Sequence, residues 1–193
     1  MLVTANALRQ SGFDRWVFQP GMRFMAPQKW WGDLGPRDFP HEGVDFCLYR
    51  NAAGQTARLD EKSVVPAMAD GAVRSIFKDF LGWAIIVEHP HFPFDNGQSL
   101  HTVYAHTTPR PGLKAGILVR QDDIIATIAD TSHFKSGIWP HLHFTMARPR
   151  RPLPYAAFYW NIMRDPGRVT LLDPEQHFSA PSQNRKADCP SRP

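Results

Sequence analysis

The chain has little cysteine, no long apolar run and no strong charge of one sign. Only two of its 193 residues are cysteines, Cys47 and Cys189, so there is no disulfide framework and the redox compartment stays open. No apolar stretch approaches the ~18 residues of a membrane span, so no span is expected. The net charge is only +4 and the basic residues are scattered, so no nucleic-acid partner is expected.

The sequence also shows no signal-peptide pattern at its start, no internal repeat and no long low-complexity block. Residues 1–23 do not show the basic-then-apolar order of a signal peptide, so either export does not use one or a leader precedes the given sequence. The length suits one domain with a sizeable core. We expect this domain over residues 1–178 and a flexible, polar tail over residues 179–193.

The fold is predicted from short apolar segments that turn residues separate. An apolar fraction of 42% and 18 prolines favour a globular protein of strands rather than long helices. We expect an all-β domain of antiparallel strands in a compact sandwich or barrel, after an irregular lead-in that ends near Pro40. At most one short helix is expected, over 155–163. The six predicted strands are residues 63–67, 72–77, 82–88, 100–106, 123–129 and 140–147.

The last predicted strand carries two histidines, His141 and His143, with one residue between them. Residues two apart in a strand point to the same face, so the two imidazoles should lie side by side. Imidazole is the commonest metal ligand and the usual proton carrier near neutral pH. The pair therefore indicates a metal site or an acid–base site, with two partly exposed strand histidines as the alternative.

A second candidate cluster lies upstream, where His41 and Asp45 are four residues apart. Pro40 and Gly43 disfavour a helix here, but an extended segment also places positions four apart on one face. Two imidazole nitrogens and one carboxylate oxygen match the ligand set of a catalytic zinc, with a fourth position open for water. Only one histidine of the downstream pair is needed, so the other remains for proton transfer. Cys47 is an alternative fourth ligand, or a buried neutral thiol.

A third histidine, His106, ends the predicted strand 100–106. Alternation places Thr102, Tyr104 and His106 on one face of that strand. His89 and His91 flank a proline, so we expect them in a loop that faces solvent.

Taken together, these motifs resemble the lysostaphin- and LytM-type zinc endopeptidases, which cut peptidoglycan cross-bridges. The family pattern of His-x-x-x-Asp, Thr-x-Tyr-x-His and Pro-His-Leu-His-Phe occurs here in the same order at 41–45, 102–106 and 140–144. The connecting segment 65–73 also resembles the strand–turn–strand of that family. The resemblance covers roughly residues 41–147, and three ordered motifs are far more specific than any one of them.

The resemblance implies a role for each matched residue. His41, Asp45 and His143 would bind one zinc ion, whose bound water attacks an amide carbonyl. His106 and His141 would stand beside the metal as general base and transition-state stabiliser, in either order. The implied substrate is a peptide of peptidoglycan or another peptide, and the implied location is the cell envelope or the extracellular space.

Two aromatic residues, Tyr104 and Trp139, are candidate substrate contacts near these motifs. The alternatives are a core tyrosine and a tryptophan that covers its strand. Trp30 and Trp31 of the lead-in likewise have two interpretations: they pack on the core, or they line a cleft.

The chain departs from the family pattern in segments that would form the cleft. Residues 116–123 lack a usual second glycine, and bulky residues replace a glycine-rich loop at 131–139. These changes leave the metal residues intact but leave the substrate open. Two other functions therefore remain: a non-catalytic LytM-like binding or activator module, and a zinc amide hydrolase for a peptide outside the cell wall.

Overall fold

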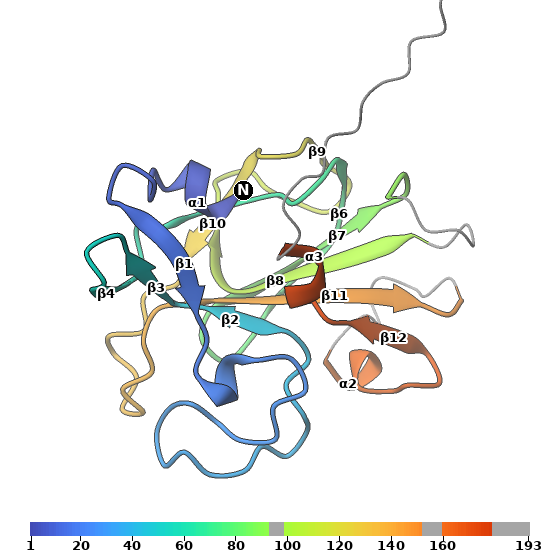
Figure 1. The fold of residues 1–193 in the computed structure, drawn as a ribbon. Helices are drawn as coiled ribbons and strands as arrows, with labels where there is room; N and C mark the ends of the chain where they lie inside the picture. The colour runs from blue at the N-terminus through green and yellow to red at the C-terminus, as the bar shows by residue number, and fades with distance from the viewer. Residues whose placement is uncertain (93–98, 152–159, 179–193) are drawn as a thin grey trace, which may run out of the picture.

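The computed structural model of the chain describes residues 1–92, 99–151 and 160–178 (Figure 1). Over these residues the elements are mostly short strands. The strands are β1 (Phe13–Val17), β2 (Val44–Phe46), β3 (Leu48–Asn51), β4 (Thr56–Arg58), β5 (Val64–Pro66), β6 (Gly71–Lys78), β7 (Trp83–His89), β8 (Leu100–Pro109), β9 (Leu118–Val119), β10 (Ile124–Ile128), β11 (Leu142–Pro149) and β12 (Val169–Leu172). The helices are α1 (Leu2–Ala5), α2 (Trp160–Met163), α3 (Glu175–Phe178) and a 3-10 turn at Pro20–Met22.

The larger sheet is antiparallel and carries the strands that the motifs occupy. Its order is β12-β11-β8-β7-β6-β9, with β2 added to β11 and with β10 joined to both β5 and β8. The long strands β7, β8 and β11 lie next to each other at its centre. The buried residues on one side of these strands form the main core, in which Tyr104 packs against Phe144 with ring centroids 5.2 Å apart.

The predicted fold class is confirmed: the described residues form antiparallel strands with little helix. All six predicted strands are present, within a few residues of their predicted ends. The described ranges contain three α-helices rather than at most one, but each has only four residues. Of the predicted helix, residues 160–163 form α2, and residues 155–159 lie outside the described part of the chain, as does the tail from residue 179.

The lead-in is less irregular than expected, because β1 pairs with β3 in a second sheet of order β1-β3-β4. Its aromatic residues explain the pairing: Trp16 meets Phe46 and Phe13 edge-on, with ring centroids 5.1 Å apart in both cases. These strands have only three to five residues, which is too short for alternation to mark them in the sequence. The lead-in therefore packs against the core instead of merely preceding it.

The prediction that His89 faces solvent is wrong. Its side chain is fully buried at the end of β7, where Nδ1 donates to the carbonyl oxygen of Asp70 and Nε2 lies 2.8 Å from Oγ1 of Thr102. Burial lowers the pKa of His89, so the ring is held in its neutral form. The neighbouring His91 is exposed, as expected.

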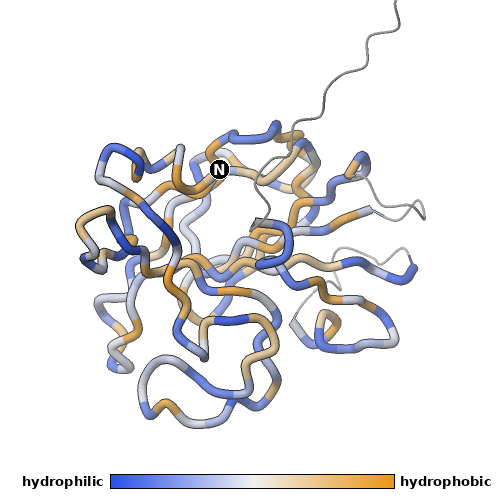
Figure 2. The backbone as a smooth tube through the Cα atoms, in the orientation of Figure 1, coloured by the Kyte–Doolittle hydropathy of each residue, from blue (hydrophilic) through white to orange (hydrophobic). Residues whose placement is uncertain are grey.

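Hydropathy follows this architecture. In Figure 2 the hydrophilic segments lie mainly in the outer loops and the hydrophobic ones mainly along the central strands. No helix in the described part of the chain has the length and apolar character needed to cross a bilayer.

Candidate metal centre and active site

Three predicted metal ligands meet where β2 pairs with β11. Asp45 and His143 are direct register partners across these two strands, so their side chains emerge side by side. His41 comes from the segment just before β2 and reaches the same point. That segment passes very close to β11, because a Cβ on Gly43 would lie 2.1 Å from the carbonyl oxygen of Phe144. Glycine at this position is therefore what allows the approach.

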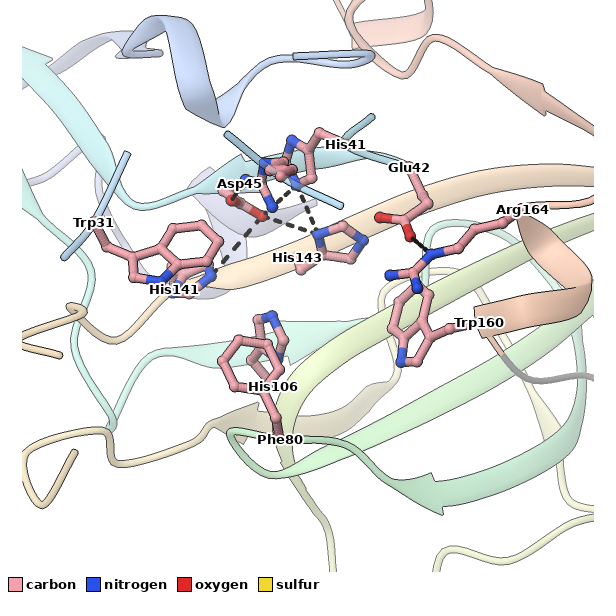
Figure 3. A pocket seen from close by; sticks show the side chains of 11 residues that line it. Trp31, His41, Glu42, Asp45, Phe80, His106, His141, His143, Trp160 and Arg164 are labelled. Carbon is pink, nitrogen blue, oxygen red and sulfur yellow. Dashed lines mark hydrogen bonds and ion pairs between the residues drawn. The ribbon is translucent and has the colours of Figure 1, made fainter. Parts of the chain in front are cut away.

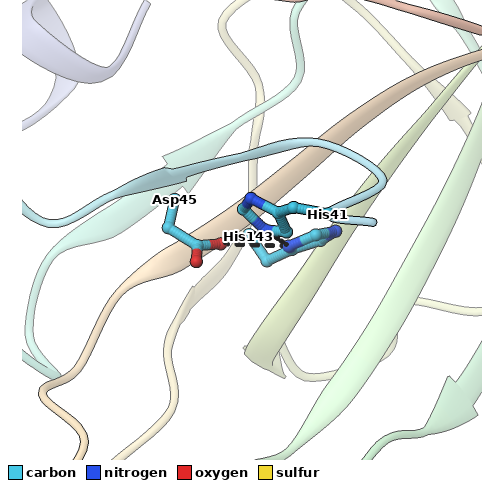
Figure 4. A group of neighbouring side chains, drawn as sticks. All are labelled: His41, Asp45 and His143. Carbon is cyan, nitrogen blue, oxygen red and sulfur yellow. Dashed lines mark hydrogen bonds and ion pairs between the residues drawn. The ribbon is translucent and has the colours of Figure 1, made fainter. Parts of the chain in front are cut away.

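The three side chains converge (Figure 4), and their ligand atoms form a nearly equilateral triangle. Nε2 of His41 lies 3.1 Å from Oδ1 of Asp45 and 2.9 Å from Nδ1 of His143, and the third side measures 3.0 Å. Donors of one tetrahedral zinc lie about 3.3–3.4 Å from each other, given bonds of about 2.0–2.1 Å. The triangle is thus slightly smaller than the one that a shared ion requires, and all three side chains are buried.

Hydrogen bonds on the far side of each imidazole turn a lone pair toward the centre of this triangle. Nδ1 of His41 donates to the carbonyl oxygen of Arg23 at 2.9 Å, which leaves Nε2 without a hydrogen in the neutral ring. Nε2 of His143 lies 2.9 Å from the Thr145 hydroxyl, and when it donates there, Nδ1 presents a lone pair. Two lone pairs and a carboxylate oxygen in a buried site are a donor set that fits a divalent cation.

The second oxygen of Asp45 is held separately. Its Oδ2 accepts a hydrogen bond of 2.6 Å from the indole nitrogen of Trp30, which orients the carboxylate. Burial by itself would raise the pKa of Asp45, but the neighbouring imidazoles of His41, His141 and His143 hold that pKa well below its usual range. Asp45 is therefore ionised and available as a ligand.

His141 lies beside the triangle but outside it. Its Nδ1 donates to the carbonyl oxygen of Trp139 at 2.8 Å, and its Nε2 is 3.9 Å from Oδ1 of Asp45. Burial lowers the pKa of His141 to about 3, so the ring is neutral and Nε2 carries a lone pair. The structure thus brings the predicted pair together, but His143 belongs to the triangle and His141 does not.

His106 enters the site by a route that the sequence does not suggest. The register of β8 with β7 shifts next to it, so that β8 has one extra residue, and His106 has φ of +61°. This bulge turns the ring toward His141 and His143, with centroid distances of 4.8 Å and 5.7 Å. The predicted shared face with Tyr104 is therefore wrong, because simple alternation fails at the bulge.

Tyr104 lies in the core on the other side of the sheet. It is fully buried, and its hydroxyl accepts a hydrogen bond of 2.7 Å from the backbone nitrogen of Met68. Its predicted contact with substrate does not fit this position, and the core alternative does. The reason is again the bulge, because it makes the side chains of Tyr104 and His106 point to different sides of the sheet.

Asp79, which the sequence reasoning missed, binds His106. Its Oδ2 accepts hydrogen bonds from the backbone nitrogen of His106 at 2.9 Å and from Nδ1 at 3.1 Å. Burial opposes ionisation, but the bonds from His106 and from backbone amides lower the pKa of Asp79 strongly. The one feature of the sequence that could have pointed to Asp79 is its position in the turn between two predicted strands, 72–77 and 82–88.

Side chains from several separate segments enclose the cavity above these residues (Figure 3). We call His41, Asp45 and His143 the floor, and Trp31, Arg37, Phe80, Trp160 and Arg164 the walls. Trp160 and Arg164 belong to α2 and the turn after it, while Trp31 and Arg37 belong to the lead-in. Arg164 forms an ion pair with Glu42, which lies next to His41.

Trp139 and Cys47 flank the site without lining the cavity. Trp139 is 38% exposed, its ring is 6.1 Å from that of Trp30, and the Arg58 guanidinium lies over it at 5.5 Å. Its contact with substrate stays a prediction. Cys47 is absent from the ligand cluster of the described residues, and burial raises the pKa of its thiol to about 12, which fits the buried neutral thiol.

A buried His/Asp/His cluster that could hold a metal ion thus lies where β2 pairs with β11, with two more imidazoles beside it. The model of Peptidase family M23 matches residues 40–154, more than half of the chain. The chain therefore belongs to peptidase family M23. The floor lies within the match, whereas Trp31, Arg37, Trp160 and Arg164 of the walls lie outside it.

Comparison with solved structures adds a distant likeness. A structure of Csd3 from Helicobacter pylori is 23% identical in sequence, with a TM-score of 0.38, and the similarity covers 85% of this chain and 37% of that one. The chain thus spans little more than a third of that protein. The comparison with curated proteins gave no match.

Proposed function

We propose that the chain is a zinc-dependent endopeptidase that hydrolyses peptide cross-links of bacterial peptidoglycan. The observation that carries this proposal is the buried triangle of His41 Nε2, Asp45 Oδ1 and His143 Nδ1, with two more imidazoles beside it. Membership of peptidase family M23 supports a peptidase that acts on the cell wall. A module that only binds would need neither the donor triangle nor the two extra histidines.

In this proposal His41, Asp45 and His143 hold the ion through the three atoms that already converge. Zinc bound here would polarise the substrate carbonyl and lower the pKa of a water molecule to about 7. The Asp45 carboxylate keeps its orientation because Trp30 holds its other oxygen.

His106 and His141 manage the protons of the reaction. Each has Nδ1 engaged with an oxygen atom behind it, so each offers Nε2 to the cleft. One of the two takes a proton from the attacking water and the proton is returned to the leaving amine, so the products are a carboxylate and an amine. Proton transfer of this kind contributes roughly 10²–10⁴-fold to the rate.

The walls suit a peptide of the cell wall. Trp31, Phe80 and Trp160 supply flat apolar surface to the cavity, and the guanidinium groups of Arg37 and Arg164 lie beside it, paired with Asp45 and Glu42. Because this substrate lies in the cell envelope, we place the site of action there or outside the cell.

The test combines metal analysis with digestion of purified peptidoglycan, with products identified by mass. We expect about one zinc per chain and release of new amino termini. His143→Ala should lose zinc and hydrolysis together, whereas His106→Ala should keep zinc and lose about 10²-fold or more of turnover. Unchanged hydrolysis in His106→Ala, or a purified chain that binds no zinc, contradicts the proposal.

A further inference from the structure

We propose that Asp79 is a positioning residue for the reaction, which sets both the ring orientation and the tautomer of His106. The kinetic part of this inference rests on the proposed function. The tautomer itself is a property of the folded chain without substrate, so it can be tested separately.

The Asp79 carboxylate accepts four hydrogen bonds, two on each oxygen. Oδ1 accepts from the backbone nitrogens of Leu81 and Gly82 at 2.9 Å and 2.7 Å. Oδ2 accepts from the backbone nitrogen and Nδ1 of His106 at 2.9 Å and 3.1 Å. One side chain thus closes the turn between β6 and β7 and grips His106 at its bulge.

The chemistry of these bonds fixes the tautomer. An ionised carboxylate can only accept hydrogen bonds, so Nδ1 of His106 must carry the hydrogen. In the neutral ring Nε2 is then the lone-pair atom, and the ring packs at 4.8 Å from His141, on the cavity side. A histidine with the opposite tautomer would present an N–H to the cavity and would be unable to accept a proton there.

Several contacts keep the turn pressed against β8. A Cβ on Gly82 would lie 2.7 Å from the carbonyl oxygen of Thr107 and 2.8 Å from the Ala129 side chain, so the turn approaches as closely as glycine permits. Phe80 covers the other side of the His106 ring, edge-on at 5.0 Å. The ring of His106 is therefore held between Asp79, Phe80 and His141.

The competing explanation is that Asp79 only caps the turn. Asp79→Asn separates the two, because an amide keeps one accepting oxygen. With that oxygen toward Leu81 and Gly82, three of the four contacts survive if His106 moves its hydrogen to Nε2 and accepts from the amide. With the amide reversed, both turn bonds are lost. The substitution should therefore preserve the turn and reverse the tautomer.

The first experiment records the ring-nitrogen NMR signals of His106 in the metal-free protein at pH 8, labelled with ¹⁵N-histidine. His106→Gln assigns the signal. We expect hydrogen on Nδ1 in the parent chain and on Nε2 in Asp79→Asn. A parent chain with hydrogen on Nε2, or the same tautomer in both proteins, overturns the proposal.

The second experiment measures turnover and zinc content in a double-mutant cycle. Asp79→Asn should lower kcat by about 10²-fold or more, with KM and zinc content nearly unchanged. In a background of His106→Ala it should have almost no further effect, because it acts through that ring. Effects that multiply in the double variant indicate a purely structural role and overturn the proposal.

Asp60 provides the matched control. It also closes a turn, through the backbone nitrogen of Lys62 and the hydroxyl of Ser63, and within the described part of the chain it has no hydrogen bond to a histidine. Asp60→Asn should leave kcat and the NMR signals of His106 unchanged. Should the parent chain fail to hydrolyse peptidoglycan, the proposed function fails, while the tautomer measurement still decides whether Asp79 sets the state of His106.

Discussion

The floor and the walls of the cavity come from different kinds of structure. The floor comes from regular sheet geometry, in which Asp45 and His143 are register partners and Gly43 permits the close approach that brings His41 to them. Most of the walls come from α2 and the lead-in, outside the residues that match the family model. The three donor atoms therefore come from the part of the chain that the family model covers, while most of the side chains above them come from segments outside it.

The largest effect is expected from a side chain added at Gly43, where the segment before β2 approaches β11 closely. Gly43→Ala places a Cβ 2.1 Å from the carbonyl oxygen of Phe144 and 2.8 Å from Oγ1 of Thr145, so β2 must move away from β11. We expect a loss of about 3 kcal/mol or more in the free energy of unfolding, together with loss of zinc binding. Denaturant unfolding and metal titration measure these two quantities.

Gly35→Ala is the control from the lead-in. The three atoms nearest to its added Cβ would all belong to the Asp33 side chain, the closest at 3.0 Å, and this exposed side chain can move aside. Stability and zinc binding should change little. A Gly43→Ala protein that binds zinc as tightly as the parent would show that the floor does not depend on the close approach of β2 and β11.

Part of the site could be predicted from the sequence because the spacing of its residues suits extended segments. His141 and His143 are two apart at the start of β11, as alternation requires. His41 and Asp45 do meet, but only Asp45 lies in a strand, and the chain bends at Glu42 and Gly43 between them. His106 and Asp79 could not be placed in this way, since a bulge and a turn orient them through bonds between residues 27 positions apart. The same limit applies to α2, whose Trp160 reaches His143 from beyond the motifs.

Trp30 and Trp31 allow a sharper test of the difference between floor and walls. Trp30 donates a hydrogen bond to the floor, whereas Trp31 is part of a wall. Trp30→Phe removes the hydrogen bond to Oδ2 of Asp45 and leaves that carboxylate oxygen without its closest donor. We expect zinc affinity to fall about 10–100-fold, as is usual when a partner of a metal ligand is lost. Metal competition with a chelator of known affinity measures the change.

Trp31→Phe is the matched control, because among the described residues this ring lines the cavity and forms no hydrogen bond to the floor. The Arg37 guanidinium lies over the ring at 4.6 Å, and it is Arg37 that reaches the floor, with Nη2 3.8 Å from Oδ2 of Asp45. Trp31→Phe should keep zinc affinity within about twofold of the parent. Equal losses of zinc affinity in the two variants would remove the distinction between floor and wall.

The smallest effect is expected at Arg164, where the C-terminal wall meets the floor. Arg164→Gln weakens the ion pair with Glu42, and because the Arg164 side chain is 34% exposed, solvent screens that pair. We expect a cost of about 1 kcal/mol or less in stability, unchanged zinc affinity, and a KM for peptide substrates raised a few-fold. Arg168→Gln, which alters an exposed pair with Asp165, should change none of these. If Arg164→Gln instead lowers zinc affinity as much as Trp30→Phe does, the wall takes part in holding the metal, and the division between a shared floor and chain-specific walls is wrong.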